Sequence, residues 1–564
     1  MPGTVLNDLS ASKSLRKYSS AASVTMARGE EPLLQRAPSD ASDDRNVEEE
    51  DALLTGQHTS RRDRRKYGWL FWREVGLFAW ALVATAAVIL LAVLYQHQQS
   101  ASPDKNSGWK SDKPSGKRNM IFMVSDGMGP TSLSLTRSFR QFESGLPPDD
   151  VLVLDKHLIG SSRTRSTSSL ITDSAAGATA FSCGFKSYNG AISVLPDHSP
   201  CGTVMEAAKR AGYMTGLVVT TRITDATPAC FVAHVNQRAE EDRIAEQETG
   251  HHPLGRVVDL MLGGGRCHFL PNTVDGSCRH DDKDVVAMAK DKGFSYVDDR
   301  EGFDGLNFGS NVKLPLLGLF AGGDIPYEVD RRNMERTYPS LDEMARTALK
   351  ALSEATKDSD KGFFLMIEGS RIDHAGHGND PVAQVHEVLA YDKAFTSVLN
   401  FLDEDDTDGV LVGTSDHETG GLSTARRKLL RITSFLHGSG LCSHEVELYK
   451  TYPEYLWYPG VLANASHSGE NLAYQLRDHI TLHTSESPKD LKTYINEELL
   501  QKGLGVDDAT EDEINSILDH PDPWPASYVF AGIISRRAQV GWSTHGHSGK
   551  PSPIKRTMNF PECR

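Results

Sequence analysis

Residues 119–127 read NMIFMVSDG, an apolar run that ends in an Asp-Gly pair. This pattern is typical of a buried strand that ends in a turn. Similar runs follow at 213–223 (YMTGLVVTTRI), 361–369 (KGFFLMIEG) and 409–421 (GVLVGTSDHETGG), and residues 381–402 have helical periodicity. Strands that alternate with helices predict an α/β fold with a mostly parallel central sheet flanked by helices.

Polar groups follow several of these runs where each strand is expected to end. Asp126 follows the first run, Glu368 closes the third, and Asp416 with His417 follows the fourth. In open parallel sheets, ligands bind at the carboxyl ends of the strands. One Asp-Gly pair after a strand is usually only a turn, but recurrence at several strand ends favours a binding site.

Residues 367–380 read IEGSRIDHAGHGND and hold the densest set of potential metal ligands. Asp373 and His377 are four residues apart, which places them on one face of a helical turn, and a carboxylate beside an imidazole suits zinc. The Glu368 carboxylate is better suited to a hard cation such as magnesium. A solvated polar loop is the alternative interpretation. Residues 543–549 (STHGHSG) add two histidines near the C-terminus.

Residues 170–184 read LITDSAAGATAFSCG and raise the question of what Ser174 does. A serine hydroxyl is a poor nucleophile until a base or a metal activates it, and no G-x-S-x-G elbow indicates a Ser-His-Asp triad. The carboxylates and histidines suffice for two zinc ions, so we expect Ser174 to be a zinc ligand. The small residues after it predict a helix whose N-terminus offers N–H groups to an anion. Alternatively, Asp173 and Ser174 form an ordinary helix N-cap.

The 564-residue chain has a formal net charge of −16, which argues against a nucleic-acid partner because phosphate backbones require clustered Lys and Arg. Its hydrophobic fraction of 38% is that of a globular protein with polar tails. Seven cysteines are too few for a disulfide scaffold, and their odd number leaves at least one unpaired. Cys267 and Cys278 flank a loop and are candidates for one bridge if the compartment is oxidising.

Residues 75–94 read VGLFAWALVATAAVILLAVL without a charged side chain, and about twenty such residues span a bilayer. We expect a transmembrane helix at 75–95; a buried core helix is the alternative, and a cleaved signal peptide does not fit a segment so far from the N-terminus. The preceding residues 61–73 (RRDRRKYGWLFWR) combine cations and aromatic rings as at a cytosolic membrane border. This asymmetry predicts a type II anchor, with the bulk of the chain on the non-cytosolic side.

Polar segments flank the expected anchor. Residues 1–66 are rich in Ser, Asp, Glu and Arg and predict a disordered cytosolic tail. Within it, Glu49, Leu53 and Leu54 of the stretch EEDALL match an acidic dileucine signal for a sorting adaptor. Residues 96–117 predict a flexible stalk.

Six motifs occur together between residues 118 and 549: VSDGMG, TDSAAGATA, TDATPACFVAHVNQR, IEGSRIDHAGH, TSDHETGG and THGHSG. In this order they are specific, and the chain resembles the alkaline phosphatase family; with its type II anchor it is most similar to the vacuolar (repressible) members of fungi. The resemblance implies an alkaline-phosphatase-like catalytic domain at 118–549, lumenal at the vacuole membrane, with the less regular residues of about 430–530 as an insertion. It also implies hydrolysis of phosphate monoesters through a phosphoserine, and a homodimer.

The resemblance assigns roles to individual residues. Ser174 matches the nucleophile and Arg238 the arginine that binds phosphate, while Asp225 and His374 occupy positions that vary within the family and tune its metal preference. For the last histidine ligand, His545 is the alternative to His547. The metal ligands implied are Asp373, His377 and His547 for one zinc, Asp126, Asp416, His417 and Ser174 for a second zinc, and Asp126, Thr227 and Glu368 for one magnesium.

Rival interpretations predict features that the sequence lacks. A sulfatase needs a C/S-x-P-x-R motif, which is absent, and related phosphodiesterases commonly use threonine where this chain has Ser174. A catalytically impaired, membrane-anchored binding protein would have lost metal ligands, and every ligand position is filled. The divergent tail at 550–564 (KPSPIKRTMNFPECR) alone supports that last alternative. It is basic and is expected to be strand-poor, so that a strand supporting the His547 loop would be missing.

The chain has one N-glycosylation sequon, Asn464-Ala465-Ser466, which would be lumenal in this topology. A chance match is the alternative. The natural phosphomonoester is not evident from the sequence. A site that binds phosphate and leaves the alcohol half in solvent would accept many substrates.

Overall fold

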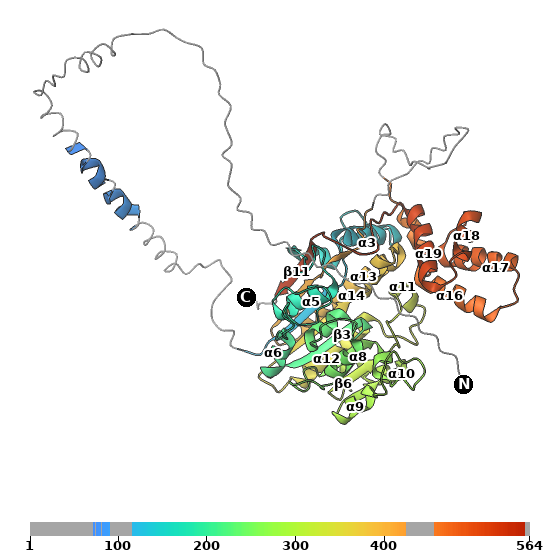
Figure 1. Cartoon of the computed structure of the whole chain (residues 1–564), viewed down its shortest axis with the longest axis horizontal. Helices are drawn as coiled ribbons and strands as arrows, with labels where there is room; N and C mark the ends of the chain where they lie inside the picture. Colours follow the sequence, from blue (N-terminus) through green and yellow to red (C-terminus); the bar gives the residue numbers. More distant parts are fainter. Residues whose placement is uncertain are drawn as a thin grey trace, which may run out of the picture. The chain divides into compact units, whose positions relative to one another are not determined.

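The computed structural model describes residues 116–424 and 456–558, and, between 72 and 90, all residues except 74, 81 and 89 (Figure 1). The expected tail at 1–66, with its Glu49–Leu54 motif, and residues 96–115 of the expected stalk lie outside the described residues.

The chain divides into two units, Met1–Ser111 and Asp112–Arg564. In the first unit, the residues described between 72 and 90 are helical. No helix among the described residues of either unit is long and apolar enough to cross a membrane.

A nine-stranded sheet forms the centre of the second unit, in the order β2-β11-β8-β1-β7-β3-β4-β6-β5. Among the described strands, the antiparallel pairs in this sheet are those that β11 makes with β2 and β8, and the other pairs are parallel. The predicted mostly parallel α/β fold is therefore confirmed. A separate two-stranded sheet pairs β9 with β10. The strands are β1 (Asn119–Ser125), β2 (Leu158–Ser162), β3 (Met214–Arg222), β4 (Leu260–Gly264), β5 (Ser295–Val297), β6 (Leu316–Leu319), β7 (Phe363–Gly369), β8 (Gly409–Thr414), β9 (Glu418–Thr419), β10 (His547–Ser548) and β11 (Ser552–Met558).

Helices connect these strands and surround the sheet (Figure 1). They are α3 (Pro130–Glu143), α4 (Val153–Lys156), α5 (Ser174–Cys183), α6 (Val204–Arg210), α7 (Ala226–Val232), α8 (Glu241–Glu248), η1 (Arg266–Phe269), α9 (Val285–Asp291), α10 (Arg300–Gly305), η2 (Asn307–Gly309), α11 (Glu328–Arg331), α12 (Leu341–Ala355), α13 (Arg371–His377), α14 (Pro381–Glu404), α15 (Pro459–Ala463), α16 (Gly469–Leu482), α17 (Pro488–Tyr494), η3 (Ile495–Gly503), α18 (Glu511–Leu518) and α19 (Pro523–Ala538).

Both faces of the sheet are buried, as the continuous apolar runs predict for parallel strands. On one face, Ile121 and Leu365 pack with Leu352 of α12 and Phe395 of α14. The other face packs against α6, α7, α8 and α9. The sheet is therefore an inner layer between two layers of helices.

The register of the central strands brings their carboxyl ends together. β1 lies between β7 and β8, with Val124 opposite Glu368 on one side and Thr414 on the other. The three strands therefore end close to the same level. Asp126 and Asp416, which follow β1 and β8, reach the same edge of the sheet as Glu368.

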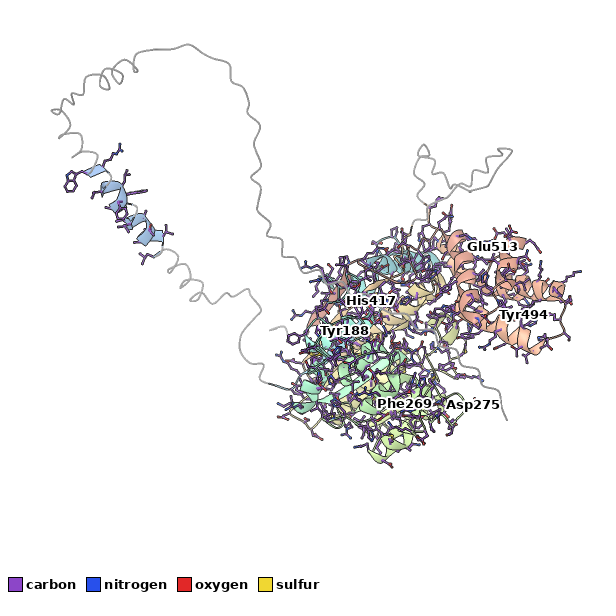
Figure 2. All side chains as sticks on the ribbon, viewed as in Figure 1. Tyr188, Phe269, Asp275, His417, Tyr494 and Glu513 are labelled. Atoms are coloured by element: carbon purple, nitrogen blue, oxygen red, sulfur yellow. A yellow bond between two sulfur atoms is a disulfide. The ribbon has the colours of Figure 1, made fainter. Side chains whose placement is uncertain are left out.

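The region expected to be an irregular insertion is helical where it is described. Residues 456–538 contain α15 to α19, which form a lobe beside the sheet (Figure 1). Figure 2 shows Tyr494 and Glu513 in this lobe and His417 in the body that holds the sheet. Leu472 of α16 and Phe530 of α19 belong to a core that also includes residues of α3 and α14, so the lobe is fixed to the body by apolar packing.

The expectation of a strand-poor tail after Gly549 is wrong. Ser552–Met558 form β11, which pairs antiparallel with β8 and with β2. Pro553 lies at the beginning of the strand, where proline is tolerated. The strand that was expected to be missing after the His547 loop is therefore present.

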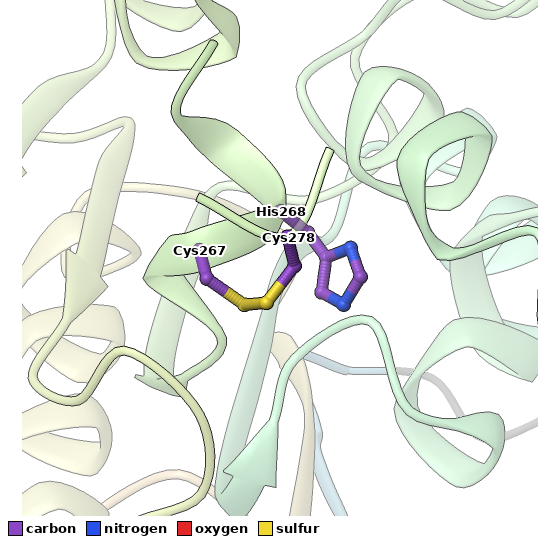
Figure 3. Close-up of side chains that lie close together, drawn as sticks. All are labelled: Cys267, His268 and Cys278. Atoms are coloured by element: carbon purple, nitrogen blue, oxygen red, sulfur yellow. A yellow bond between two sulfur atoms is a disulfide. The ribbon is translucent and has the colours of Figure 1, made fainter. Parts of the chain in front are cut away.

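Two disulfides are present among the described residues. The expected Cys267–Cys278 bridge is confirmed, and Figure 3 shows its two sulfur atoms bonded beside His268. These cysteines are therefore not thiolate metal ligands. The second bridge joins Cys183 at the end of α5 to Cys201, a pairing that the sequence alone does not predict.

Candidate active site

Ser174 is the first residue of α5, and its neighbour Asp173 is the N-cap, whose carboxylate accepts from the N–H of Ala176 at 2.9 Å. The N-cap interpretation is thus correct for Asp173, and it accounts for the position of Ser174. The Ser174 side chain is nearly fully buried. Its Oγ lies 3.0 Å from Nε2 of His417, a residue that follows β8 on the other side of the site.

The imidazole of His417 faces carboxylate oxygens. Its Nε2 lies 3.1 Å from Asp416 Oδ2 and 3.5 Å from Asp126 Oδ1. Thr419 Oγ1 donates its single proton to Asp373, so it accepts a hydrogen bond from His417 Nδ1 at 3.2 Å. Because Nδ1 carries the proton of the neutral ring, Nε2 of His417 carries none. Among the described residues, the buried atoms Asp126 Oδ1 and Asp416 Oδ2 have no hydrogen-bond partner. Acceptors that converge without a donor fit a cation, and two carboxylates with one imidazole suit zinc.

Asp373, His377 and His547 form a second group, whose ligand atoms lie within 4.8 Å of one another. Nε2 of His377 is 3.2 Å from Asp373 Oδ2, Nε2 of His547 is 3.6 Å from Asp373 Oδ1, and the two Nε2 atoms are 3.1 Å apart. Nδ1 of His377 donates to the carbonyl of His545, and Nδ1 of His547 donates to that of Thr172. Both Nε2 lone pairs therefore face the group, as in zinc-binding histidines oriented by backbone carbonyls.

The geometry distinguishes the two C-terminal histidines. His547 belongs to β10, which pairs with β9 so that His547 lies opposite Thr419. The His545 side chain turns away, with Nδ1 against the carbonyl of His377 and its ring against Tyr528. The imidazole of His547 therefore faces the carboxylate of Asp373, whereas His545 contributes its backbone carbonyl.

Oxygen atoms form a third group, which shares Asp126 with the first. Asp126 Oδ2 accepts from Thr227 Oγ1 at 3.3 Å, and Glu368 Oε2 accepts from Ser370 Oγ at 2.7 Å. Thr227 lies in the first turn of α7, and all these residues are buried. A group of carboxylate and hydroxyl oxygens suits a hard cation such as magnesium.

The electrostatics of these groups favour cations. Burial and the neighbouring carboxylates raise the pKa of Asp126 and of Glu368 well above the ordinary values. Burial lowers the pKa of His377, but the adjacent Asp373 more than compensates and raises it to about 9. The raised pKa values of these three groups favour their protonated, more positive forms when no cation is bound.

Arg238 lies beside the N-terminus of α5. Its Nη2 donates to Asp225 Oδ1 at 2.8 Å, and its Nη1 is 3.7 Å from Asp173 Oδ2. The two carboxylates hold the guanidinium next to Ser174, while the side chain remains 37% exposed. The exposed N–H groups suit two oxygens of one phosphate.

Asp225 and His374 are part of a charged network beside this arginine. Arg222 contacts Asp225 at 3.1 Å and Asp324 at 2.8 Å. His374 Nδ1 lies 3.3 Å from Asp324 Oδ2, and Nε2 lies 3.9 Å from Asp225 Oδ2. The sequence did not identify Arg222 or Asp324. Arg222 lies two residues before the motif that begins at residue 224, which is a usable signal, whereas Asp324 comes from a remote loop.

Gly127 allows the turn after β1 to approach α13. Its φ is +74°, and an added Cβ would lie 2.5 Å from Cα of Asp373. Glycine is therefore required here for conformation and for space. Because Gly127 follows Asp126 in the chain, its close approach to Asp373 brings two of the predicted metal groups together.

The structure thus brings together every metal-ligand position that the sequence predicted, along with Ser174 and Arg238. Asn464 is exposed at the end of α15, in the helical lobe. A buried serine among carboxylates and imidazoles, at the carboxyl edge of a mostly parallel sheet, is the arrangement of a metal-dependent α/β hydrolase.

Comparisons with known proteins define the family. The sequence pattern of the alkaline phosphatase family matches residues 117–556. The chain is 50% identical to the repressible alkaline phosphatase of Saccharomyces cerevisiae over 513 residues, which cover 89% of this chain and 84% of that protein. It is 44% identical to an alkaline phosphatase of Schizosaccharomyces pombe, with 89% and 85% covered. The chain therefore belongs to the alkaline phosphatase family and is a phosphomonoesterase.

Solved structures agree with this assignment. Alkaline phosphatase from Thermus thermophilus superimposes with a TM-score of 0.62 at 29% identity, covering 78% of this chain and 86% of that one. The cold-active enzyme from a Shewanella species gives 0.61 at 28% identity, with 79% and 94% covered.

Proposed function

We propose that this chain hydrolyses phosphate monoesters through a phosphoserine at Ser174, in a centre that holds two zinc ions and one magnesium ion. The observation that carries the proposal is the position of Ser174 Oγ, buried and 3.0 Å from His417 Nε2. That nitrogen faces two carboxylate oxygens without hydrogen-bond partners among the described residues.

The three groups of side chains would each hold one ion. Asp373, His377 and His547 would hold one zinc, Asp126, Asp416, His417 and Ser174 a second zinc, and Asp126, Thr227 and Glu368 the magnesium. When bound, such cations lower the pKa of a hydroxyl and offset negative charge on phosphoryl oxygens. Asp225 and His374 orient Arg238 and its network from outside the metal ligands.

The protein groups then account for the reaction. Arg238 binds two phosphate oxygens and orients the phosphorus toward Ser174. Ser174 Oγ forms a bond to phosphorus as the bond to the alcohol oxygen breaks, and the alcohol leaves with a proton. A water molecule then attacks the phosphorus, breaks its bond to Ser174 and releases inorganic phosphate. The N-terminus of α5, fixed by Asp173, offers N–H groups to the anion.

Replacing Ser174 with alanine tests this proposal. With zinc and magnesium present, we expect the full-length Ser174→Ala variant to lose turnover of p-nitrophenyl phosphate and to retain zinc on the histidines and carboxylates. Ser182→Ala is the matched control, because Ser182 is a buried serine of the same helix, and it should retain turnover. A wild type that binds metal and turns over sulfate esters or diesters but not monoesters would favour those alternatives. A wild type that binds metal but turns over no ester would favour a binding protein.

We also propose that the catalytic unit is lumenal at the vacuole membrane, on a single-pass type II anchor at 75–95. The uncharged stretch and its basic flank support the anchor. The two disulfides support an oxidising compartment, and the exposed Asn464 is accessible for glycosylation. The Glu49–Leu54 motif remains a predicted adaptor signal.

A homodimer is the proposed assembly. The exposed apolar side chains of Ile159, Leu170 and Phe185 support it, because a second copy could cover them. The segments that carry Leu170 and Phe185 are neighbours, since the Thr167 N–H donates to the carbonyl of Ser187. Light scattering of the purified chain should give the mass of two copies, and a monomeric mass would exclude the dimer.

A further inference from the structure

A cavity of about 580 Å³ lies beside the catalytic centre. On one side it is lined by His374 and His377, at the end of α13. On the other side it is lined by Tyr474 of α16 and by Trp524 and Tyr528 of α19. The cavity thus lies between the predicted metal ligands and the helical lobe.

The aromatic side of the cavity has exposed rings. Trp524 is 69% exposed and Tyr474 is 45% exposed. The rings of Trp524 and Tyr528 pack edge to face, with their centroids 5.4 Å apart. Exposed aromatic side chains that line a cavity are typical of ligand-binding surfaces.

The helices that carry these rings are firmly positioned. A Cβ on Gly469, the first residue of α16, would lie 2.8 Å from the carbonyl oxygen of Ser527 in α19. Leu472 and Phe530 continue the contact in the core of the lobe. The aromatic surface is therefore preformed, which lowers the entropy that a ligand loses on binding.

The position of the cavity relates it to the leaving group. In-line displacement at phosphorus requires the attacking and leaving oxygens on opposite sides. Ser174, the attacking group, lies against His417, whereas the cavity is lined by His377 of the other group and by neither Ser174 nor His417. A phosphate held at Ser174 would therefore direct its ester oxygen toward His377 and its alcohol into the cavity.

The two arginines that line the cavity, Arg222 and Arg371, are already paired with carboxylates. The guanidinium carbon of Arg371 lies 3.7 Å from the centroid of the Tyr327 ring. The same guanidinium donates two hydrogen bonds to the Glu470 carboxylate, at 3.0 and 2.9 Å. Arg222 is engaged by carboxylates as described above. The cavity therefore offers aromatic faces rather than an unpaired cation for a second anionic group.

We propose that this cavity binds the alcohol part of the substrate, and that the chain favours monoesters whose alcohol carries an uncharged aromatic ring, such as a nucleoside, stacked on Trp524 and Tyr474. The inference rests on the proposed function. It gives the enzyme a substrate preference, in contrast to the expectation that the alcohol half remains in solvent.

Two esters with similar leaving groups test the inference. Adenosine 5′-monophosphate and glycerol 1-phosphate both release a primary alcohol, so their kcat/KM ratio reports on binding of the alcohol part. We expect the full-length wild type to prefer the adenosine ester, and Trp524→Ala to reduce that preference by about tenfold through KM, in line with the loss of one base–aromatic stack. Trp524→Phe should restore most of it. Leu482→Ala, an exposed apolar residue of α16 outside the cavity, should leave the ratio unchanged.

Failure of the substrate preference and failure of the proposed function give different results. The inference would be overturned if the wild type did not prefer the adenosine ester, or if the kcat/KM ratio of the two esters were the same in Trp524→Ala and wild type. In either case, turnover of both esters would still support the phosphatase activity. Turnover of both esters by Ser174→Ala at the wild-type rate would overturn the proposed function itself. Because Trp524 is largely exposed, its replacement should fold, and a circular dichroism spectrum and a thermal unfolding midpoint equal to those of the wild type verify this.

Discussion

Replacing Gly127 with alanine should force the turn after β1 away from α13. An added Cβ would lie 2.5 Å from Cα and 2.7 Å from Cβ of Asp373, at a φ of +74°. The left-handed conformation costs a residue other than glycine about 1–2 kcal/mol, and overpacking costs about 1–3 kcal/mol more. We expect Gly127→Ala to lower the free energy of unfolding by about 2–5 kcal/mol. It should also weaken zinc binding, because α13 carries Asp373 and His377.

Gly276→Ala is the matched control. Gly276 has a similar φ of +79°, but no described atom lies within 4 Å of an added Cβ. It should therefore show the conformational cost alone, about 1–2 kcal/mol, and retain zinc. Urea unfolding of both full-length variants, with zinc content measured after gel filtration, gives the comparison. Equal unfolding midpoints and equal zinc content in the two variants would refute the close contact between the turn and α13.

Three further changes test other parts of the structure. Arg238→Lys removes the guanidinium fork and should weaken inhibition by inorganic phosphate about 10- to 100-fold, since hydrogen bonds to charged groups contribute about 1.5–3 kcal/mol; unchanged inhibition would contradict the phosphate contact. Thr419→Val removes the hydroxyl that contacts both Asp373 and His417, and it should lower zinc affinity about 10- to 100-fold in competition with a chelating dye; unchanged affinity would show that this hydroxyl does not orient the ligands. Burial lowers the pKa of Lys555 to about 8 in the folded chain. Above that pH the unfolded chain binds more protons than the folded chain, so the free energy of unfolding should rise by about 3 kcal/mol as the pH approaches the ordinary lysine pKa. Lys555→Met should abolish the rise in denaturation midpoint between about pH 7 and 11, and persistence of the rise would assign it to other groups.

The central part of the fold was predictable because its signals are local. The apolar run at 119–127 and the run that contains Glu368 form β1 and β7, which pair in parallel. Buried parallel strands need continuous apolar residues, so their positions are evident from the sequence. The polar residues at their ends then meet because parallel strands end at one edge.

Features that depend on distant partners were not predictable. Ser552–Met558 has little strand character of its own, and its pairing with β8 and β2 stabilises it as β11. The Cys183–Cys201 bridge and the contact of Asp324 with Arg222 likewise join segments that the fold brings together. The sequence favoured His547 over His545 through the resemblance, and the structure adds the reason, since the His547 ring is the one that faces Asp373.

The most direct test of the proposed reaction is whether phosphate is transferred to Ser174. The wild-type chain, loaded with zinc and magnesium and mixed with a phosphate monoester, would be quenched in acid and digested, and its peptides analysed by mass spectrometry. We expect a phosphorylated peptide that contains Ser174 and is absent from Ser174→Ala. Monoester turnover by Ser174→Ala at the wild-type rate, with no phosphate on the wild-type Ser174 peptide, would contradict the phosphoserine reaction.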